Sequence, residues 1–180
     1  MAYDAAGEDD APDLGAAGAA MREEWRAEQE SVTHDAAEQW RHSRTLLDLA
    51  RDLMHRGDPV VVGAGGHRFA GVIVEVARDR IALFDEAHDA RADVQVVESI
   101  PLSLTVVERA RSGGRSGAQF ASFRARLLEL EGRAVTLSTT LGPDRVTGTL
   151  GVGIDVVMVT TAVGETFVPL STVVAVAPDG

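Results

Sequence analysis

The strongest constraint on the fold of this chain is a repeat, because a helical segment followed by five short β-rich segments occurs twice in its 180 residues. Stretches containing glycine, proline and aspartate separate the β-rich segments, which is typical of strands joined by turns. The first set comprises residues 60–62, 69–76, 80–84, 94–97 and 104–107, and the second comprises residues 134–138, 145–150, 156–160, 165–168 and 172–176. The pattern predicts two small β-modules, each preceded by a helix.

The two copies can be aligned with small gaps. Gly57 aligns with Gly132, Gly71 with Gly148, Asp79 with Asp155, and residues 100–103 with residues 168–171. The shared glycines suit sharp bends in strongly curved strands, where a side chain would clash, and the shared aspartate suits the turn between the second and third strands. We interpret these matches as signals of folding, not of chemistry.

Two short patterns within the repeat resemble the first motif of the Sm-like family of small β-barrels. That motif has an apolar residue, any residue and glycine, followed by an aspartate and an apolar strand. Phe69-Ala70-Gly71 with Asp79, and Val146-Thr147-Gly148 with Asp155, have this form. The resemblance covers residues 46–108 and 118–177, and SH3-like and PRC-type barrels share its periodicity. It implies two tandem five-stranded small β-barrels, each preceded by a helix.

The chain departs from the Sm-like pattern at the second motif of that family. An Arg-Gly pair normally precedes the last strand there, whereas this chain has Ile100-Pro101 and Val168-Pro169 at the two corresponding places. The nucleotide-binding residues of the family therefore have no counterpart here. As a whole, the chain also resembles actinobacterial proteins labelled Fis-family regulators. That label implies a C-terminal helix-turn-helix, but residues 134–177 predict strands.

The predicted fold class is mainly β with helices, organised in five segments. Residues 1–20 form a disordered acidic tail, residues 21–56 a long helix, residues 57–110 the first barrel, residues 111–133 an Arg/Gly linker with a short amphipathic helix, and residues 134–180 the second barrel. The long helix is predicted because residues 21–56 contain neither glycine nor proline, with residues 31–33 as an alternative break point. Only its second half carries enough apolar side chains to dock firmly.

Composition excludes several classes of function. The chain has no cysteine, which excludes disulfide scaffolds, cysteine zinc sites and thiol nucleophiles. Its 17 basic residues are all arginine, so the lysine of a phosphate-binding loop is missing and NTP hydrolysis is excluded. The formal net charge is −11, so most of the surface should repel phosphate. We expect a cytoplasmic protein without membrane contact, since no long apolar segment is present.

Few residues suggest chemistry. Asp85-Glu86-Ala87-His88 matches the acidic box of a helicase family, but without a phosphate-binding loop it reads as a solvated loop. The glycines at positions 63, 65 and 66 lead into a strand, which favours a hairpin turn over a phosphate cradle. Glu30, His34, Glu38 and His42 recur every four residues, which is common decoration of an exposed helix face. We therefore predict no catalytic residue, no metal site and no cofactor.

Two groups of residues are candidates for contact with a partner. Arg111, Arg115, Arg124 and Arg126 interleave with Phe120 and Phe123, and such a mixture can neutralise phosphates and stack on bases, or meet an acidic partner. Alternatively, the phenylalanines are the buried face of a helix and the arginines contact the acidic tail or remain solvated. In the preceding helix, Trp25, Val32 and Trp40 are candidates for docking on a partner helix.

Two functions of different classes follow. In the first, the chain is a non-enzymatic protein-binding adaptor or regulatory protein that binds another protein, or itself, through the N-terminal helix or the barrel edges. In the second, it is a divergent Sm-like regulator that binds RNA or DNA, which the acidic charge disfavours. The sequence leaves open whether the two modules pair with each other or with other copies in a ring.

Overall fold

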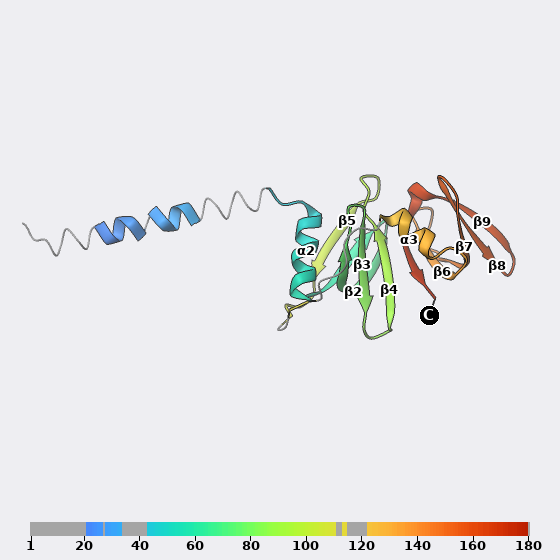
Figure 1. Cartoon of the computed structure of the whole chain (residues 1–180), viewed down its shortest axis with the longest axis horizontal. Helices are drawn as coiled ribbons and strands as arrows, with labels where there is room; N and C mark the ends of the chain where they lie inside the picture. Colours follow the sequence, from blue (N-terminus) through green and yellow to red (C-terminus); the bar gives the residue numbers. More distant parts are fainter. Residues whose placement is uncertain (1–20, 27, 34–42, 111–112, 115–121, 180) are drawn as a thin grey trace, which may run out of the picture. The chain divides into compact units, whose positions relative to one another are not determined.

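A computed structural model describes residues 21–26, 28–33, 43–110, 113–114 and 122–179. Residues 1–44 and 45–180 form two separate units. In the first unit, residues 21–26 and 28–33 are helical. The described residues of the second unit form two α-helices, one short 3₁₀ helix and ten strands, so the prediction of a mainly β fold with helices is confirmed (Figure 1). The predicted tail and most of the predicted linker lie outside the described residues.

All ten predicted strands are present, with ends that differ by a few residues from the predicted ones. The first five are β1 (Pro59–Ala64), β2 (His67–Val76), β3 (Arg80–Asp85), β4 (Ala90–Gln95) and β5 (Leu102–Val106). The second five are β6 (Ala134–Thr139), β7 (Val146–Val152), β8 (Val156–Thr161), β9 (Gly164–Pro169) and β10 (Val173–Pro178), with a 3₁₀ turn, η1 (Leu170–Thr172), before β10. The C-terminal part of the chain therefore forms strands, as expected, and not a helix-turn-helix.

The prediction of two tandem five-stranded β-barrels is not confirmed in that form, because the ten described strands form one open antiparallel sheet. Its order is β5-β1-β2-β3-β4-β10-β6-β7-β8-β9, so each half keeps its five strands together. The halves join where β4 pairs with β10, with Val94 opposite Ala175 and Asp93 opposite Val176. A module that stays open leaves unpaired backbone groups along its edge strands, and pairing two such edges satisfies both. Hydrophobic periodicity cannot distinguish this outcome from closure.

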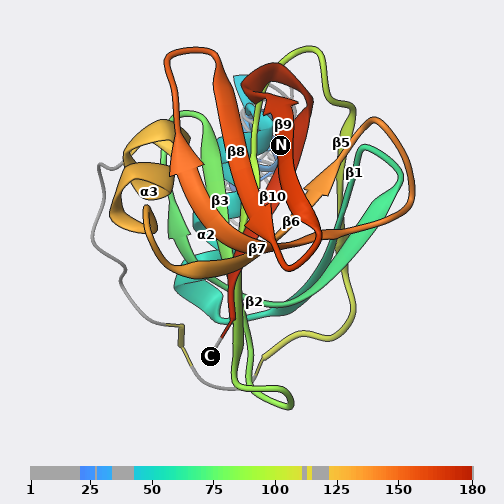
Figure 2. The ribbon, with the colours of Figure 1, turned by 90° about the vertical axis from the view of Figure 1, so that its right-hand side faces the viewer.

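Strand β10 belongs to the hydrophobic cores of both halves. Val174 and Ala175 pack in the cluster of the first half, whereas Val173 and Val176 pack in the cluster of the second. The pairing of β10 with β6 shifts register between Val173 and Ala175, and such an irregularity redirects neighbouring side chains. The curvature of the strands around the second core is visible in Figure 2. Separating the halves would expose both cores, so we expect them to unfold together.

Helix α2 (Leu46–Arg56) covers the first half of the sheet. Its N-cap is Thr45, whose side chain accepts a hydrogen bond from the backbone N–H of Asp48, while the Asp48 side chain accepts one from the Thr45 backbone. The Thr45 hydroxyl also donates a hydrogen bond to Asp48 Oδ2 at 2.7 Å, and this bond is the main cause that lowers the pKa of Asp48. Because Thr45 is extended, the predicted helix over residues 21–56 is interrupted there, whereas residues 31–33 are helical.

Helix α3 (Phe123–Glu129) precedes the second half and contacts strands of both halves, β4 and β7. Ser122 caps it by accepting a hydrogen bond from the backbone N–H of Ala125. Phe123 and Leu127 are fully buried in the second core, which confirms that Phe123 belongs to the buried face of this helix. Phe120 lies outside the described residues. The predicted hairpin turn also forms, with Gly65 and Gly66 at positive φ between β1 and β2.

Candidate interaction surfaces

A buried ion cluster crosses the junction between the two halves. Asp93 on β4 is fully buried and accepts hydrogen bonds from three arginines. The distances to its carboxylate oxygens are 2.5 Å from Arg80 Nη1, 3.0 Å from Arg91 Nη2 and 3.0 Å from Arg126 Nε. Arg126 comes from α3, so the cluster ties the helix of the second half to a strand of the first. Arg80 and Arg91 also bind Glu75 on β2.

The charges in this cluster balance. Burial lowers the pKa of Arg91, but hydrogen bonds and charge from Asp93 and Glu75 outweigh that effect and raise the pKa above its ordinary value. Arg91 therefore stays charged. Arg126 makes a further ion pair with Glu129 at 3.0 Å, so three arginines face three carboxylates. A buried cluster neutralised in this way holds elements together and leaves no group free for acid–base chemistry.

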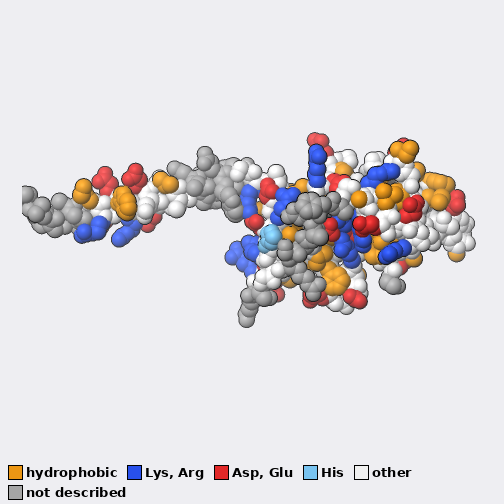
Figure 3. Space-filling view, in the orientation of Figure 1, with side chains coloured by type: hydrophobic (Ala, Val, Ile, Leu, Met, Phe, Trp, Pro, Cys, Tyr) orange, Lys and Arg blue, Asp and Glu red, His pale blue; other side chains and the backbone are white. Residues whose placement is uncertain are grey.

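The structure places two of the four predicted contact arginines. Arg126 is only 17% exposed and belongs to the ion cluster, and Arg124 donates a hydrogen bond to the backbone oxygen of Ile154. Arg111 and Arg115 lie outside the described residues. Both described arginines therefore make contacts within the chain, which neither alternative from the sequence anticipated. Acidic and basic side chains are intermixed on the face of residues 45–180 shown in Figure 3.

The helical residues of the first unit present apolar side chains to solvent. Trp25 is 69% exposed and Val32 is 62% exposed, and Met21, which lies four residues before Trp25 on the same helix face, is 73% exposed. Trp40 lies outside the described residues, as do His34, Glu38 and His42. Within the described parts of the chain, no group of three or more acidic or histidine side chains is placed to hold a metal ion. No helix there is long and apolar enough to cross a membrane.

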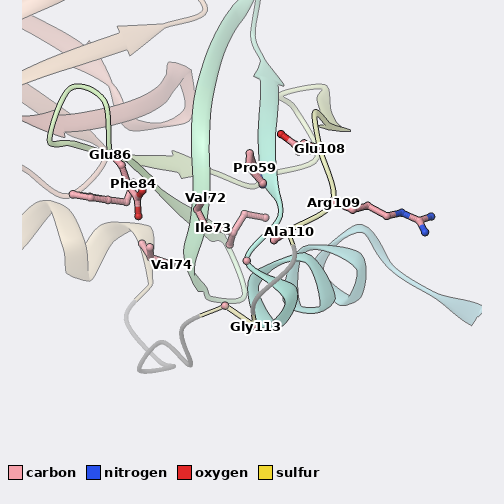
Figure 4. Close-up of a pocket in the computed structure, with 12 residues that line it drawn as sticks. Pro59, Val72, Ile73, Val74, Phe84, Glu86, Glu108, Arg109, Ala110 and Gly113 are labelled. Carbon is pink, nitrogen blue, oxygen red and sulfur yellow. The ribbon is translucent and has the colours of Figure 1, made fainter.

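A cavity of about 410 Å³ lies beside the segment that leaves β5 (Figure 4). Apolar walls come from Pro59, Val72 and Phe84, while Arg109 extends away from the other labelled side chains. The segment is held close to α2, since Gly114 N–H donates to the His55 oxygen at 2.8 Å and Ala110 N–H donates to Asp58 at 2.8 Å. The charged residues among its lining are Glu86, Glu108 and Arg109, and none of them makes an ion pair that would point to a catalytic arrangement among the described residues.

The two ends of the sheet, β5 and β9, are open edges. Each is paired on one side only among the described strands, β5 with β1 and β9 with β8. Apolar side chains are exposed along both edges. Phe167 on β9 is 62% exposed, Val106 on β5 is 42% exposed, and Val107 just after β5 is 65% exposed. Unpaired backbone groups beside exposed apolar side chains are a template for pairing with another strand.

The free edges correspond, through the repeat, to the two strands that pair at the junction. Strand β9 holds the place in the second half that β4 holds in the first, and β5 holds the place of β10. Phe167 on β9 pairs with Met158 on β8, and Asp93 on β4 pairs with Ala82 on β3, so Phe167 and Asp93 occupy equivalent places in the two halves. In the same way, Leu104 on β5 pairs with Val62 on β1, and Val176 on β10 pairs with Leu137 on β6. The pair Asp93–Val176 at the junction therefore corresponds to Phe167 and Leu104 on the free edges. This register corrects the sequence alignment of residues 100–103 with residues 168–171, since Val168 and Pro169 lie within β9 whereas Ile100 and Pro101 follow the end of β4.

No protein-family model matches this chain, and no curated protein matches it. What the chain does must therefore be inferred from its own surfaces. Of these surfaces, the free edges β5 and β9 are the clearest candidates, because the equivalent strands β10 and β4 already pair with each other at the junction.

Proposed function

We propose that the chain is a cytoplasmic, non-enzymatic protein-binding scaffold, an adaptor or regulatory protein whose binding sites are the two free edges of its sheet. The observation that carries this proposal is the exposure of apolar side chains on β9 and β5, two strands with an unpaired side among the described residues. A partner strand added to such an edge gains backbone hydrogen bonds and contacts with these side chains. The charge of −11 and the internal contacts of Arg124 and Arg126 favour this function over nucleic-acid binding.

The partner that best fits these edges is a second copy of the chain. The β4–β10 junction is a working example of how the two kinds of edge pair, so β9 of one copy can pair with β5 of the next. The register of the junction then brings Phe167 beside Leu104 of the neighbouring copy, an apolar pair at the place where the junction has Asp93 beside Val176. A head-to-tail contact of this kind closes into a ring or continues as a filament. The Sm-like resemblance supports it, since proteins of that family form rings.

The substitution Phe167→Lys tests this function. Lysine on an edge strand opposes strand addition, so we expect the variant to weaken self-association by about tenfold or more. The light-scattering mass of the wild type should rise with concentration above the 19.0 kDa of one chain, while the variant stays near that mass.

Leu141→Lys is the matched control. Leu141 is 66% exposed, close to the exposure of Phe167, but lies in the loop between β6 and β7 and not on an edge. The control should associate like the wild type. A wild type that stays monomeric throughout, or a Leu141→Lys variant as impaired as Phe167→Lys, would contradict the proposal.

A further inference from the structure

A second cavity, of about 200 Å³, lies on the sheet at the junction, and both halves line it. Its first-half lining includes Arg68, Ala70, Asp85, Ala90 and Ala92, and its second-half lining includes Thr136, Ser138, Arg145, Ala175 and Ala177. Side chains two residues apart on a strand point to the same face of the sheet. The cavity is therefore lined by one face of β2 (Arg68 and Ala70), β4 (Ala90 and Ala92), β6 (Thr136 and Ser138) and β10 (Ala175 and Ala177). Most of them are small or hydroxyl-bearing, which leaves room over the sheet.

Two arginines stand on this cavity without an ionic partner among the described residues. Arg68 and Arg145 are both exposed, and each precedes the bend glycine of its own copy, Gly71 or Gly148, by three positions. The repeat thus supplies one arginine from each half. The third lining arginine, Arg91, is different because its guanidinium is bound to Glu75 and Asp93.

One carboxylate, Asp85, also lines the cavity. His88 Nδ1 lies 2.7 Å from Asp85 Oδ2. This hydrogen bond is the largest effect on the pKa of Asp85 and lowers it, although burial acts in the opposite direction. Asp85 is therefore ionised near neutral pH and can accept a hydrogen bond from a ligand hydroxyl. The cavity offers two unpaired guanidinium groups against this one carboxylate, in a chain whose net charge is strongly negative.

We propose that the junction cavity binds a small phosphomonoester that carries hydroxyl groups, a sugar phosphate. Guanidinium groups match phosphate oxygens in a planar, two-point geometry, so Arg68 and Arg145 hold the phosphate. Ser138 and Asp85 supply partners for the hydroxyl groups, whereas the Thr136 hydroxyl is already bonded to Thr147 and Asp179. The volume lies below the range of about 300–1,000 Å³ that is usual for pockets of drug-sized ligands, which favours a small ligand.

Such a ligand would also stabilise the junction. It contacts an arginine of each half, while the strands themselves meet there through the short β4–β10 pairing. Ligand that binds only the folded chain raises its stability with ligand concentration. Occupancy of this cavity should therefore raise the melting temperature of the full chain.

The test is titration calorimetry of the full chain with ribose 5-phosphate, inorganic phosphate and ribose, all at one ionic strength. We expect ribose 5-phosphate to bind more tightly than either of the other two. Arg68→Gln and Arg145→Gln should each weaken it by about tenfold, because each removes a charge-assisted hydrogen bond. Arg78→Gln, which removes an exposed arginine from the β2–β3 turn outside the cavity, should leave the affinity unchanged.

Ala70→Leu gives an independent check, since it fills the exposed mouth of the cavity without changing charge and should also weaken binding. The edge variant Phe167→Lys should bind ribose 5-phosphate like the wild type, which separates this site from the proposed edges. Absence of binding, or equal weakening by Arg78→Gln and Arg68→Gln, would overturn the site. Equal affinity for inorganic phosphate and ribose 5-phosphate would overturn the assignment of a sugar phosphate.

Discussion

Replacing Asp93 with alanine is expected to lower the free energy of unfolding of the full chain by about 3–5 kcal/mol. The carboxylate is fully buried and is shared by Arg80, Arg91 and Arg126. Its removal leaves Arg80, whose side chain is 2% exposed, with Glu75 as its remaining ionic partner. It also removes the ion pair between Arg126 on α3 and the first half, so that the hydrogen bond from the Phe123 backbone N–H to Asp79 at 2.9 Å is left to join them. Chemical denaturation followed by circular dichroism measures the loss.

Glu129→Ala is the control for this prediction. Glu129 pairs with Arg126 as well, but its side chain is 57% exposed, so its ion pair is screened by solvent. We expect its removal to change the free energy of unfolding by no more than about 0.5 kcal/mol. If Asp93→Ala costs less than about 1 kcal/mol, the cluster does not hold the two halves together.

Gly71→Ala and Gly148→Ala are each expected to cost about 2–4 kcal/mol in the free energy of unfolding. A Cβ atom at Gly71 would lie 2.6 Å from the backbone oxygen of Phe84, and one at Gly148 would lie 2.3 Å from that of Thr160. Both distances are far below normal contact, and the obstacle is backbone of the next strand. Gly71 also has φ 153°, which L side chains rarely adopt.

The control is Gly142→Ala, since nothing lies within 4 Å of a Cβ atom at that position. Its effect should stay within about 0.5 kcal/mol, as for other surface substitutions. Thermal and urea unfolding of the three variants measure these changes in the free energy of unfolding. Comparable losses at Gly71 and Gly148 would support the repeat, because the two glycines are aligned in it, whereas a Gly148→Ala variant as stable as Gly142→Ala would contradict the required bend.

The strands were predictable because their signals are local. Alternating apolar residues, and turns such as the one at Gly65 and Gly66, depend on neighbours within a few positions. The joining of the halves was not predictable, because closure and pairing with another edge use the same hydrophobic pattern. The helix break at Thr45 left a signal that could have been used, since Thr45 and Asp48 have the spacing of a capping box.

The candidate interaction surfaces were likewise predictable only in part. The sequence marks Arg126 as a candidate contact residue. Its partner Asp93 lies 33 residues away in the chain, on a strand whose sequence contains no pattern that predicts this contact. A charged residue inside an apolar strand needs a partner, and this rule could have marked Arg80 and Asp93 but not paired them. Arg68 and Arg145 were within reach of the sequence, because the alignment of the two copies already places them at equivalent positions.

Cross-linking of engineered cysteines tests the proposed edge pairing most directly, because the chain contains no cysteine of its own. Residues directly opposite each other in an antiparallel pair have Cα atoms about 4.5–5.5 Å apart, within reach of a disulfide. A mixture of the Phe167→Cys and Leu104→Cys variants should form a disulfide-linked dimer under mild oxidation. If this pair cross-links no faster than a control pair of Leu141→Cys with Leu104→Cys, the free edges do not meet and the scaffold does not assemble through them.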